Sequence, residues 1–440
     1  MDTGLALGVL GLVLLLFLIA IRVPIAYTMI LVGFIGTSIQ SGPAIVLNQL
    51  KDLAYAQFSV YDLSVLPMFI LMGGLAGRSG LSRDLFRGAN AWLGHFRGGI
   101  AMAAIAACGG FGAVCGSSTA TASTMGQVAL PELRRYRYAP SLATGTIAAG
   151  GTLGILIPPS VVLIVYAIIV EANVVALFAA ALVPGLLAIL FFIATIAIYV
   201  RLVPGSGPAG ARVDRAELFA ATLGVVPVFV IFGVVIGGIY AGIYNPTPAA
   251  AIGVFLVALF GFAMRRLSLR GTVEAFLETA RTTGMIFLIL LGAELLKIFM
   301  ARAGVPQAVA LSLQESGLSP MAIMLLIVAI FIVLGCLMDS LSMVILAIPF
   351  FWPVVAGLDY GMNPDELKMW FGVIILVVVE LGLITPPVGL NVFIINSLAP
   401  DVPMRETFKG VMPFFASEIV RIAVLLAFPA ITLALPRLLS

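Results

Sequence analysis

The sequence of 440 residues has few charged side chains and a single histidine. Lys, Arg, Asp and Glu together make up 10% of the residues, and 62% are hydrophobic. A soluble domain usually carries about 25% charged residues and about 45–50% apolar ones. So few charges could not cover the surface of a water-soluble fold of this size. The composition therefore argues against a soluble enzyme.

Cysteine is also scarce, and no nucleotide-binding motif is present. The three cysteines, Cys108, Cys115 and Cys336, lie in apolar or Gly-rich runs without metal-ligand spacing. We interpret them as small buried side chains and expect neither a disulfide framework nor a transition-metal site. The sequence contains no GxxxxGK[ST] motif, so ATP binding by a P-loop is not expected.

Long uncharged runs are abundant. No charged residue occurs in 98–131, 138–170, 172–200 or 218–264. A membrane-spanning helix needs roughly 20 apolar residues, so these runs predict an all-α polytopic membrane protein. Unbroken apolar runs do not fit a transmembrane β-barrel, whose strands alternate. The predicted spans are 4–21, 24–41, 62–77, 140–170, 175–200, 218–241, 247–264, 283–303, 368–398 and 411–436.

Two further apolar stretches, 98–131 and 318–357, are interrupted near their middle by polar residues. We predict that each is a re-entrant helical hairpin. The alternative, two ordinary spans joined by a buried turn, fits 318–357 but not 98–131, whose arms of about 16 residues are short for a crossing.

The basic residues predict the topology. With ten spans, two hairpins and an external N-terminus, 17 of the 23 Lys and Arg residues fall in inner loops. This distribution follows the positive-inside rule and predicts that both termini are external, which means periplasmic in a bacterial inner membrane. The first apolar stretch follows Asp2 and has no basic residues before it, so we interpret it as a retained helix rather than a cleaved signal.

The two halves of the sequence repeat one another. Leu153–Pro159 (LGILIPP) matches Leu381–Pro387 (LGLITPP) at an offset of 228, and the polar hairpin tips match at an offset of 223, pairing Gly116 with Asp339. In the predicted topology the two hairpins open to opposite sides. The chain is therefore interpreted as an inverted repeat, as in many secondary transporters.

The Pro-Pro pairs fall near the middle of two predicted spans. Proline removes an amide donor and opens the helix, and free carbonyl groups at membrane depth need a partner. A sodium ion is the natural candidate because hard cations prefer oxygen ligands, and Ser160 and Thr385 add hydroxyl groups beside the breaks. The alternative is a structural kink satisfied by neighbouring side chains.

The hairpin tips are rich in small and polar residues. The run Gly116–Ser123 carries hydroxyl groups that can bind a cation or an anionic ligand, and the amide ends of half-helices attract carboxylates. Helix packing by Ser and Thr is the alternative. Asp339, at the second tip, is expected to need a cation or a donor, and Glu380 is a weaker candidate of the same kind. Glu294–Lys297 and Glu418–Arg421 are interpreted as internal ion pairs.

Five motifs together resemble the large membrane subunit of the TRAP (tripartite ATP-independent periplasmic) transporters. They are GSSTAT at 116–121, LGILIPPS at 153–160, YNPTPAAA at 244–251, GCLMDSLSM at 335–343 and LGLITPPVGLNVF at 381–393. One departure is Thr247-Pro248, where the family often has Thr-Glu, so no ligand role is assigned to that turn.

The resemblance implies an inverted-repeat, elevator-type transporter in which two re-entrant hairpins and two Pro-Pro-broken helices move against a scaffold. It implies a sodium-coupled importer of small organic acids, with Na⁺ as coupling ion and no other cofactor. The implied partners are a small four-helix membrane subunit and a periplasmic substrate-binding protein, with membrane lipid around the chain and no nucleic acid.

The implied division of the chain has five parts. They are scaffold helices in 1–97, a first transport repeat in 98–171, scaffold helices in 172–303, a second transport repeat in 304–400 and a C-terminal helix in 401–440. The second scaffold part includes a cytoplasmic linker at 201–216 and an interfacial amphipathic helix at 268–282, for which a solvated loop helix is an equal alternative.

The same resemblance assigns the site residues. Sodium is expected at Gly116, Ser117, Ser118, Gly154, Pro158, Asp339, Ser340, Ser342, Gly382, Thr385 and Pro386. The solute is expected near Ser118, Thr119 and Asn391.

Three other functions were considered. A dicarboxylate symporter of related fold would work without a binding protein. A membrane hydrolase using Ser117 or Ser118 lacks a well-placed base, because His95, the one histidine, lies in a basic loop far from Asp339 in sequence. A scaffold without transport would give the paired helix breaks no purpose.

Overall fold

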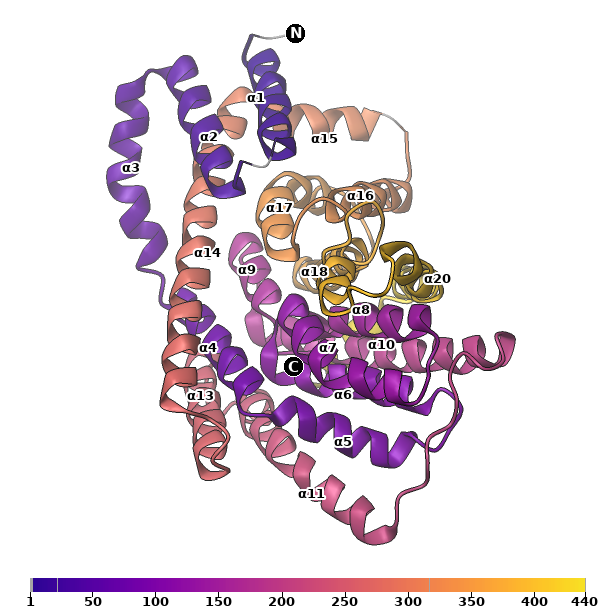
Figure 1. Cartoon of the computed structure of the whole chain (residues 1–440). Helices are drawn as coiled ribbons and strands as arrows, with labels where there is room; N and C mark the ends of the chain where they lie inside the picture. The colour runs from indigo at the N-terminus through magenta and orange to yellow at the C-terminus, as the bar shows by residue number, and fades with distance from the viewer. Residues whose placement is uncertain (1–2, 22, 316, 440) are drawn as a thin grey trace.

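The computed structural model describes residues 3–21, 23–315 and 317–439, and within these ranges all regular elements are helices (Figure 1). Arg22, which the predicted topology assigns to an inner loop, lies outside the described residues. The first half contains α1 (Thr3–Ala20), α2 (Ile25–Ser41), α3 (Pro43–Phe58), the 3₁₀ turn η1 (Tyr61–Ser64), α4 (Val65–Arg78), α5 (Leu81–Leu93), α6 (Gly99–Cys115), α7 (Ser118–Arg135), α8 (Pro140–Leu156), α9 (Val161–Val170) and α10 (Val174–Leu202). The second half contains α11 (Arg215–Phe232), the π-helical turn η2 (Gly233–Gly237), α12 (Gly238–Tyr240), α13 (Pro246–Ala263), α14 (Leu269–Ala303), α15 (Val305–Glu315), α16 (Pro320–Gly335), α17 (Ser340–Ala356), α18 (Pro364–Gly382), α19 (Leu390–Leu398), α20 (Met404–Ala427) and α21 (Ala430–Leu439).

The helices suit a polytopic membrane protein. Among the described residues, six helices are long and apolar enough to cross a bilayer, or up to eight if each of two bent pairs is one span. Several other apolar helices, including α2 and the arms α6, α16 and α17, have 16 or 17 residues. The sequence predicts ten spans, and only some of them correspond to helices long enough to cross a bilayer.

A pair of packed helices occupies each predicted hairpin, and a helix break occurs at each Pro-Pro pair. Whether either helix pair is re-entrant stays a prediction. α6 packs against α7, and α16 packs against α17. α8 and α9 are separated by residues 157–160 and bend by 45°. α18 and α19 are separated by residues 383–389, which include the second Pro-Pro pair. The side of the membrane from which each hairpin enters stays a prediction.

The two repeats interlock through their second halves. α7 of the first hairpin contacts α19, which follows the second break, and α17 of the second hairpin contacts α9, which follows the first break. This exchange brings residues at least 170 positions apart into one centre. It is the arrangement that positions the site.

Close packing depends on glycine where α8 crosses α20. A Cβ atom on Gly410 would lie 1.8 Å from the carbonyl oxygen of Ser141, and one on Gly145 would lie 2.3 Å from the carbonyl carbon of Gly410. Only two glycines allow the backbones to approach this closely. α8 is almost entirely enclosed, with an unbroken buried stretch from Leu142 to Leu156.

Residues 268–282, predicted as an interfacial amphipathic helix, are helical from Leu269 but continue without a break into the next predicted span. Their place at the interface stays a prediction. This segment is the first part of α14, a single helix of 35 residues that packs against α2 and α4 (Figure 1). The Ser268 hydroxyl group caps its N-terminus by accepting from the amide of Gly271 at 3.0 Å. No proline interrupts the segment, so the charged stretch and the apolar stretch continue as one helix.

Other boundaries also differ. α3 and α5 were not predicted, because charges interrupt their apolar pattern: α5 is amphipathic and buries Leu81, Leu85 and Phe86 while Arg83 and Arg87 remain exposed. The predicted span 411–436 is divided into α20 and α21 at Phe428 and Pro429. The linker predicted at 201–216 is non-helical from residue 203 to 214.

Candidate functional site

The two hairpin tips have matching capping geometry. Ser117 caps α7 by accepting from the amide of Ala120 at 3.4 Å, and Asp339 caps α17 by accepting from the amide of Ser342 at 3.1 Å. Such side-chain caps satisfy amides that have no partner within the helix. Ser118 and Ser340 are therefore equivalent, because each is the first residue of its helix. The sequence offset of 223 instead pairs Ser340 with Ser117, one residue earlier.

Glu380 joins these two serines. The Ser118 hydroxyl group donates to one carboxylate oxygen of Glu380 at 2.5 Å, and the Ser340 hydroxyl group donates to the other at 2.7 Å. Glu380 lies near the end of α18, is fully buried and forms no ion pair among the described residues. One carboxylate therefore links the tip of the first repeat to the tip of the second.

Each tip also packs against the break of its own repeat. A Cβ atom on Gly154 would lie 2.5 Å from the carbonyl oxygen of Ser117. In the second repeat, a Cβ atom on Gly382 would lie 2.5 Å from the Cα atom of Gly335. Glycine at these positions lets the hairpin backbone lie directly on the broken helix.

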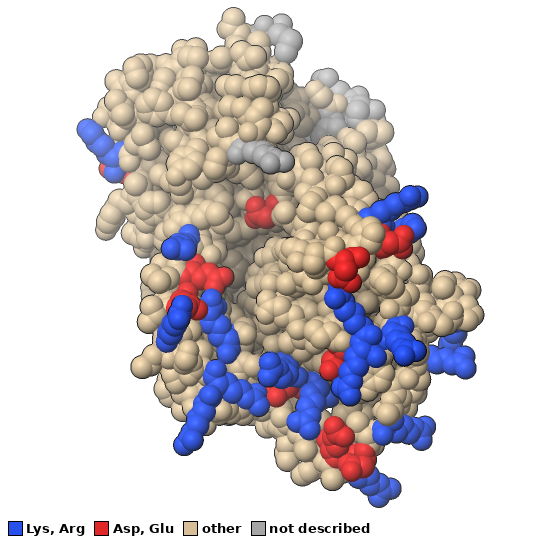
Figure 2. All heavy atoms as spheres, viewed as in Figure 1, with Lys and Arg blue, Asp and Glu red and all other residues tan. Residues whose placement is uncertain are grey.

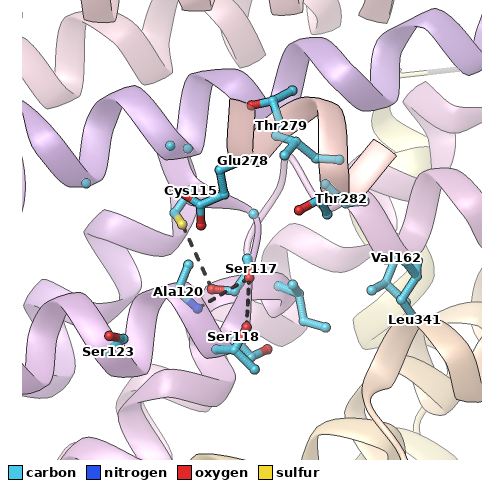
Figure 3. Close-up of a pocket in the computed structure, with 18 of the residues that line it drawn as sticks. Cys115, Ser117, Ser118, Ala120, Ser123, Val162, Glu278, Thr279, Thr282 and Leu341 are labelled. Atoms are coloured by element: carbon cyan, nitrogen blue, oxygen red, sulfur yellow. Dashed lines mark hydrogen bonds between the residues drawn. The ribbon is translucent and has the colours of Figure 1, made fainter. Parts of the chain in front are cut away.

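A cavity of about 620 Å³ opens beside the tips. Its wall combines the first tip with residues of α4 and α14, and Figure 3 shows Ser117 and Ser118 near Glu278, Thr279 and Thr282. Ligand cavities in proteins typically measure about 300–1,000 Å³, so the space suits a small solute. Hydroxyl groups and the carboxylates of Asp339 and Glu278 provide oxygen atoms at its surface.

The structure brings together about half of the predicted site residues at the cavity wall. Those that line it are Gly116, Ser117, Ser118, Thr119, Asp339 and Ser340. Those that do not are Gly154, Pro158, Ser342, Gly382, Thr385, Pro386 and Asn391.

Asn391 is the predicted solute contact that does not line the cavity. Its side chain is fully buried and its amide donates to the carbonyl oxygen of Ala148 in α8 at 3.3 Å. The carbonyl oxygen of the same side chain is buried without a hydrogen-bond partner. In this structure Asn391 therefore connects α19 to α8 behind the cavity.

The side of the cavity formed by α4 was not predicted from the sequence. Gly73, Gly74, Gly77 and Arg78 of α4 line it, and Arg78 forms an ion pair with Glu278 at 2.9 Å. The spacing of the three glycines was an available signal for close helix approach. In the sequence, Glu278 is one charged residue of the predicted amphipathic helix at 268–282.

The predicted internal ion pairs are present. Arg421 and Glu418 form a fully buried pair, and Arg421 also donates to the carbonyl oxygen of Pro184 at 3.2 Å. Lys297 and Glu294 form a more exposed pair at 3.5 Å. Among the described residues, no group of three or more His, Cys, Asp or Glu side chains could hold a metal ion together.

The described helices therefore form a membrane-protein fold in which two helix pairs and two broken helices, together with α4 and α14, surround a cavity. Comparison with solved structures agrees: the YdaH transporter of Alcanivorax borkumensis matches with a TM-score of 0.61 at 14% identity, covering 88% of each chain. At this identity the likeness concerns the fold alone.

The sequence comparisons identify the family. Residues 12–431 match the family described as the DctM component of the tripartite ATP-independent periplasmic transporters. The chain is 35% identical over 399 residues to the C4-dicarboxylate TRAP transporter large permease protein DctM of Pseudomonas aeruginosa, covering 89% of this chain and 91% of that one. It is 30% identical to the sialic acid TRAP transporter large permease protein SiaM of Vibrio cholerae, covering 86% and 87%. The chain belongs to the TRAP transporter family and is a large membrane subunit of it. Its relatives are permeases rather than enzymes.

Proposed function

We propose that this large permease imports a small organic acid with sodium as the coupling ion. The observation that carries the proposal is the junction at Glu380, where hydroxyl groups from both hairpin tips meet beside a cavity of about 620 Å³. Relatives named for C4-dicarboxylate, sialic acid and ectoine transport support a small polar solute that would fit this cavity.

Sodium coupling is supported by the chemistry of the tips. Hard cations prefer oxygen ligands, and the tip regions offer the serine hydroxyl groups of both repeats together with the Asp339 carboxylate. Helix termini add oriented backbone groups, as in other secondary transporters. The predicted sodium residues that pack behind the tips would complete the coordination from the two breaks.

The interlocked repeats support movement as one body. α7 contacts α19 and α9 contacts α17, so the hairpins and the broken helices would shift together against α2, α4 and α14. We propose that a periplasmic binding protein delivers the solute and that a small membrane subunit supports the scaffold, as the names of the relatives imply for a large permease. Both termini are proposed to be periplasmic.

Reconstitution in proteoliposomes tests the proposal. The large and small subunits are incorporated together, the binding protein is added outside, and uptake of radiolabelled succinate and sialic acid is measured with and without an inward sodium gradient. Uptake that needs both the gradient and the binding protein supports it. Uptake that ignores sodium would refute sodium coupling.

The same assay separates the alternative function. A self-sufficient symporter of related fold would take up solute at an equal rate when the binding protein is omitted. Loss of uptake on omission favours the tripartite function.

A further inference from the structure

A second cavity, of about 980 Å³, adjoins the first. The two cavities share three lining residues, Gly77 and Arg78 at the end of α4 and Thr124 of α7. A Cβ atom on Gly77 would lie 3.7 Å from the Thr124 hydroxyl oxygen, so the absence of a side chain at Gly77 leaves space where the cavities meet. The first cavity, called the hairpin site below, and the second cavity therefore share part of their walls.

The wall of the second cavity is basic. It is built from α5, α7 and the segment that leads into α11, and its charged residues are Arg78, Arg83, Arg87, Arg135, Arg212, Glu132, Asp214 and Glu217. Three of the arginines are paired with acids: Arg78 with Glu278, Arg87 with Glu217 and Arg135 with Glu132. Arginine is therefore in excess at this wall.

Two arginines of this wall, Arg83 and Arg212, and one acid, Asp214, remain outside these pairs. Both arginines are exposed, and neither forms a salt bridge within the part of the chain that the structure describes. Figure 2 shows Lys and Arg side chains gathered over the lower half of this face, below a hollow at its middle. A cleft with an excess of one sign of charge attracts ions of the opposite sign, and here five arginines face three acids.

We propose that the second cavity is an anion-binding vestibule that receives a carboxylate from the hairpin site and releases it at the inner face. Arg78 stands where the two cavities meet, and Arg83 and Arg212 attract the anion further along. The direction of release rests on the proposed function and on the inner location of the basic residues. The attraction for anions rests on the cavity alone.

Charge-selective labelling of a cysteine at the junction tests the vestibule without any transported solute. Thr124 is replaced by Cys in a chain whose three native cysteines are replaced by Ala, and the full-length protein is placed in lipid nanodiscs. The labelling rates of anionic 2-sulfonatoethyl and cationic 2-(trimethylammonium)ethyl methanethiosulfonate are each divided by the rate with a small thiol in solution. A basic vestibule should favour the anionic reagent by about tenfold, with the preference falling as salt is added.

Two double variants of equal charge distinguish the vestibule from general surface charge. R83Q together with R212Q should reduce the anion preference by roughly fivefold. R201Q together with R281Q removes two exposed inner arginines that line neither cavity, and it should leave the preference unchanged. If the cysteine-free chain does not fold, the measurement is made in a chain that loses only Cys115. All three native cysteines are buried, but Cys115 lines the first cavity, whereas Cys108 and Cys336 line neither cavity.

The outcomes are distinct from those of the transport assay. Equal labelling by the two reagents, or equal effects of the two double variants, would overturn the vestibule even in a protein that transports with sodium. A clear anion preference that depends on Arg83 and Arg212 would support it even if uptake proved independent of sodium.

Discussion

The junction between Ser118, Glu380 and Ser340 makes a quantitative prediction about the coupling between the two repeats. Replacing Ser118 by Ala leaves one oxygen of the buried Glu380 carboxylate without its donor, and replacing Glu380 by Ala leaves both hydroxyl groups without an acceptor. An unsatisfied buried polar group costs about 1–3 kcal/mol. In the double variant the carboxylate is absent, so most of the Ser118 penalty should disappear.

A double-mutant cycle measures this coupling. We expect a coupling energy of about 1–3 kcal/mol between Ser118→Ala and Glu380→Ala, and a similar value between Ser340→Ala and Glu380→Ala. The assay is the free energy of unfolding from denaturant titrations in mixed micelles. Glu380→Gln keeps the size and one acceptor oxygen, and should be less destabilising than Glu380→Ala.

Thr144→Ala is the matched control. Its hydroxyl group is also buried, but it donates to the carbonyl oxygen of Pro140 in its own helix at 2.8 Å. Its effect should add to that of Glu380→Ala within about 0.5 kcal/mol. Additive effects for both serines would refute the idea that one carboxylate holds the two tips together.

Three further substitutions test other parts of the structure. Gly410→Ala should destabilise the protein by about 1–3 kcal/mol or more, measured by thermal unfolding, because the new methyl group meets the carbonyl oxygen of Ser141. Arg421→Met should cost about 3–5 kcal/mol by leaving Glu418 buried without its partner, whereas exchanging both residues for Met should recover most of that loss; equal losses would contradict the pairing. Asp339→Asn should preserve the thermal midpoint because Asn and Asp are equivalent helix caps, while the sodium concentration needed for half-maximal uptake rises about tenfold; unchanged sodium dependence would remove Asp339 from the sodium site.

The local features of the fold were predictable from the sequence because they depend on neighbouring residues. The Pro-Pro pairs at 158–159 and 386–387 require helix breaks, and both breaks occur between helices of the structure. The hydroxyl-rich run after Gly116 likewise marks the first tip. In these places chain chemistry alone determines where a helix ends.

Features that depend on contacts between distant segments were not predictable in the same way. Ser118 and Glu380 are 262 positions apart, and no local pattern shows that a carboxylate on α18 reaches the first tip. The sequence interpretation therefore ranked Glu380 below Asp339. Asn391 shows the converse, because its polar side chain in a conspicuous motif is buried against α8 rather than at the cavity.

The boundaries of α14 show a different difficulty. Charged residues in 268–282 and apolar residues in 283–303 suggested two environments, hence two elements. A change from charged to apolar side chains does not by itself end a helix. No proline interrupts this segment, so it forms one helix. The consequence for the site was missed as well, because Glu278, Thr279 and Thr282 reach the cavity from this continuous helix.

The single carboxylate at the centre also breaks the symmetry of the duplicated architecture. Under the offset of 228 that relates the two breaks, Glu380 corresponds to Thr152, whose hydroxyl group bonds only to the carbonyl oxygen of Ala149 in its own helix at 2.7 Å. The two halves share the arrangement of their helices, but only the second carries a carboxylate at this position. At its centre the structure is therefore asymmetric in charge, because one carboxylate, and not a matched pair, serves both hairpin tips.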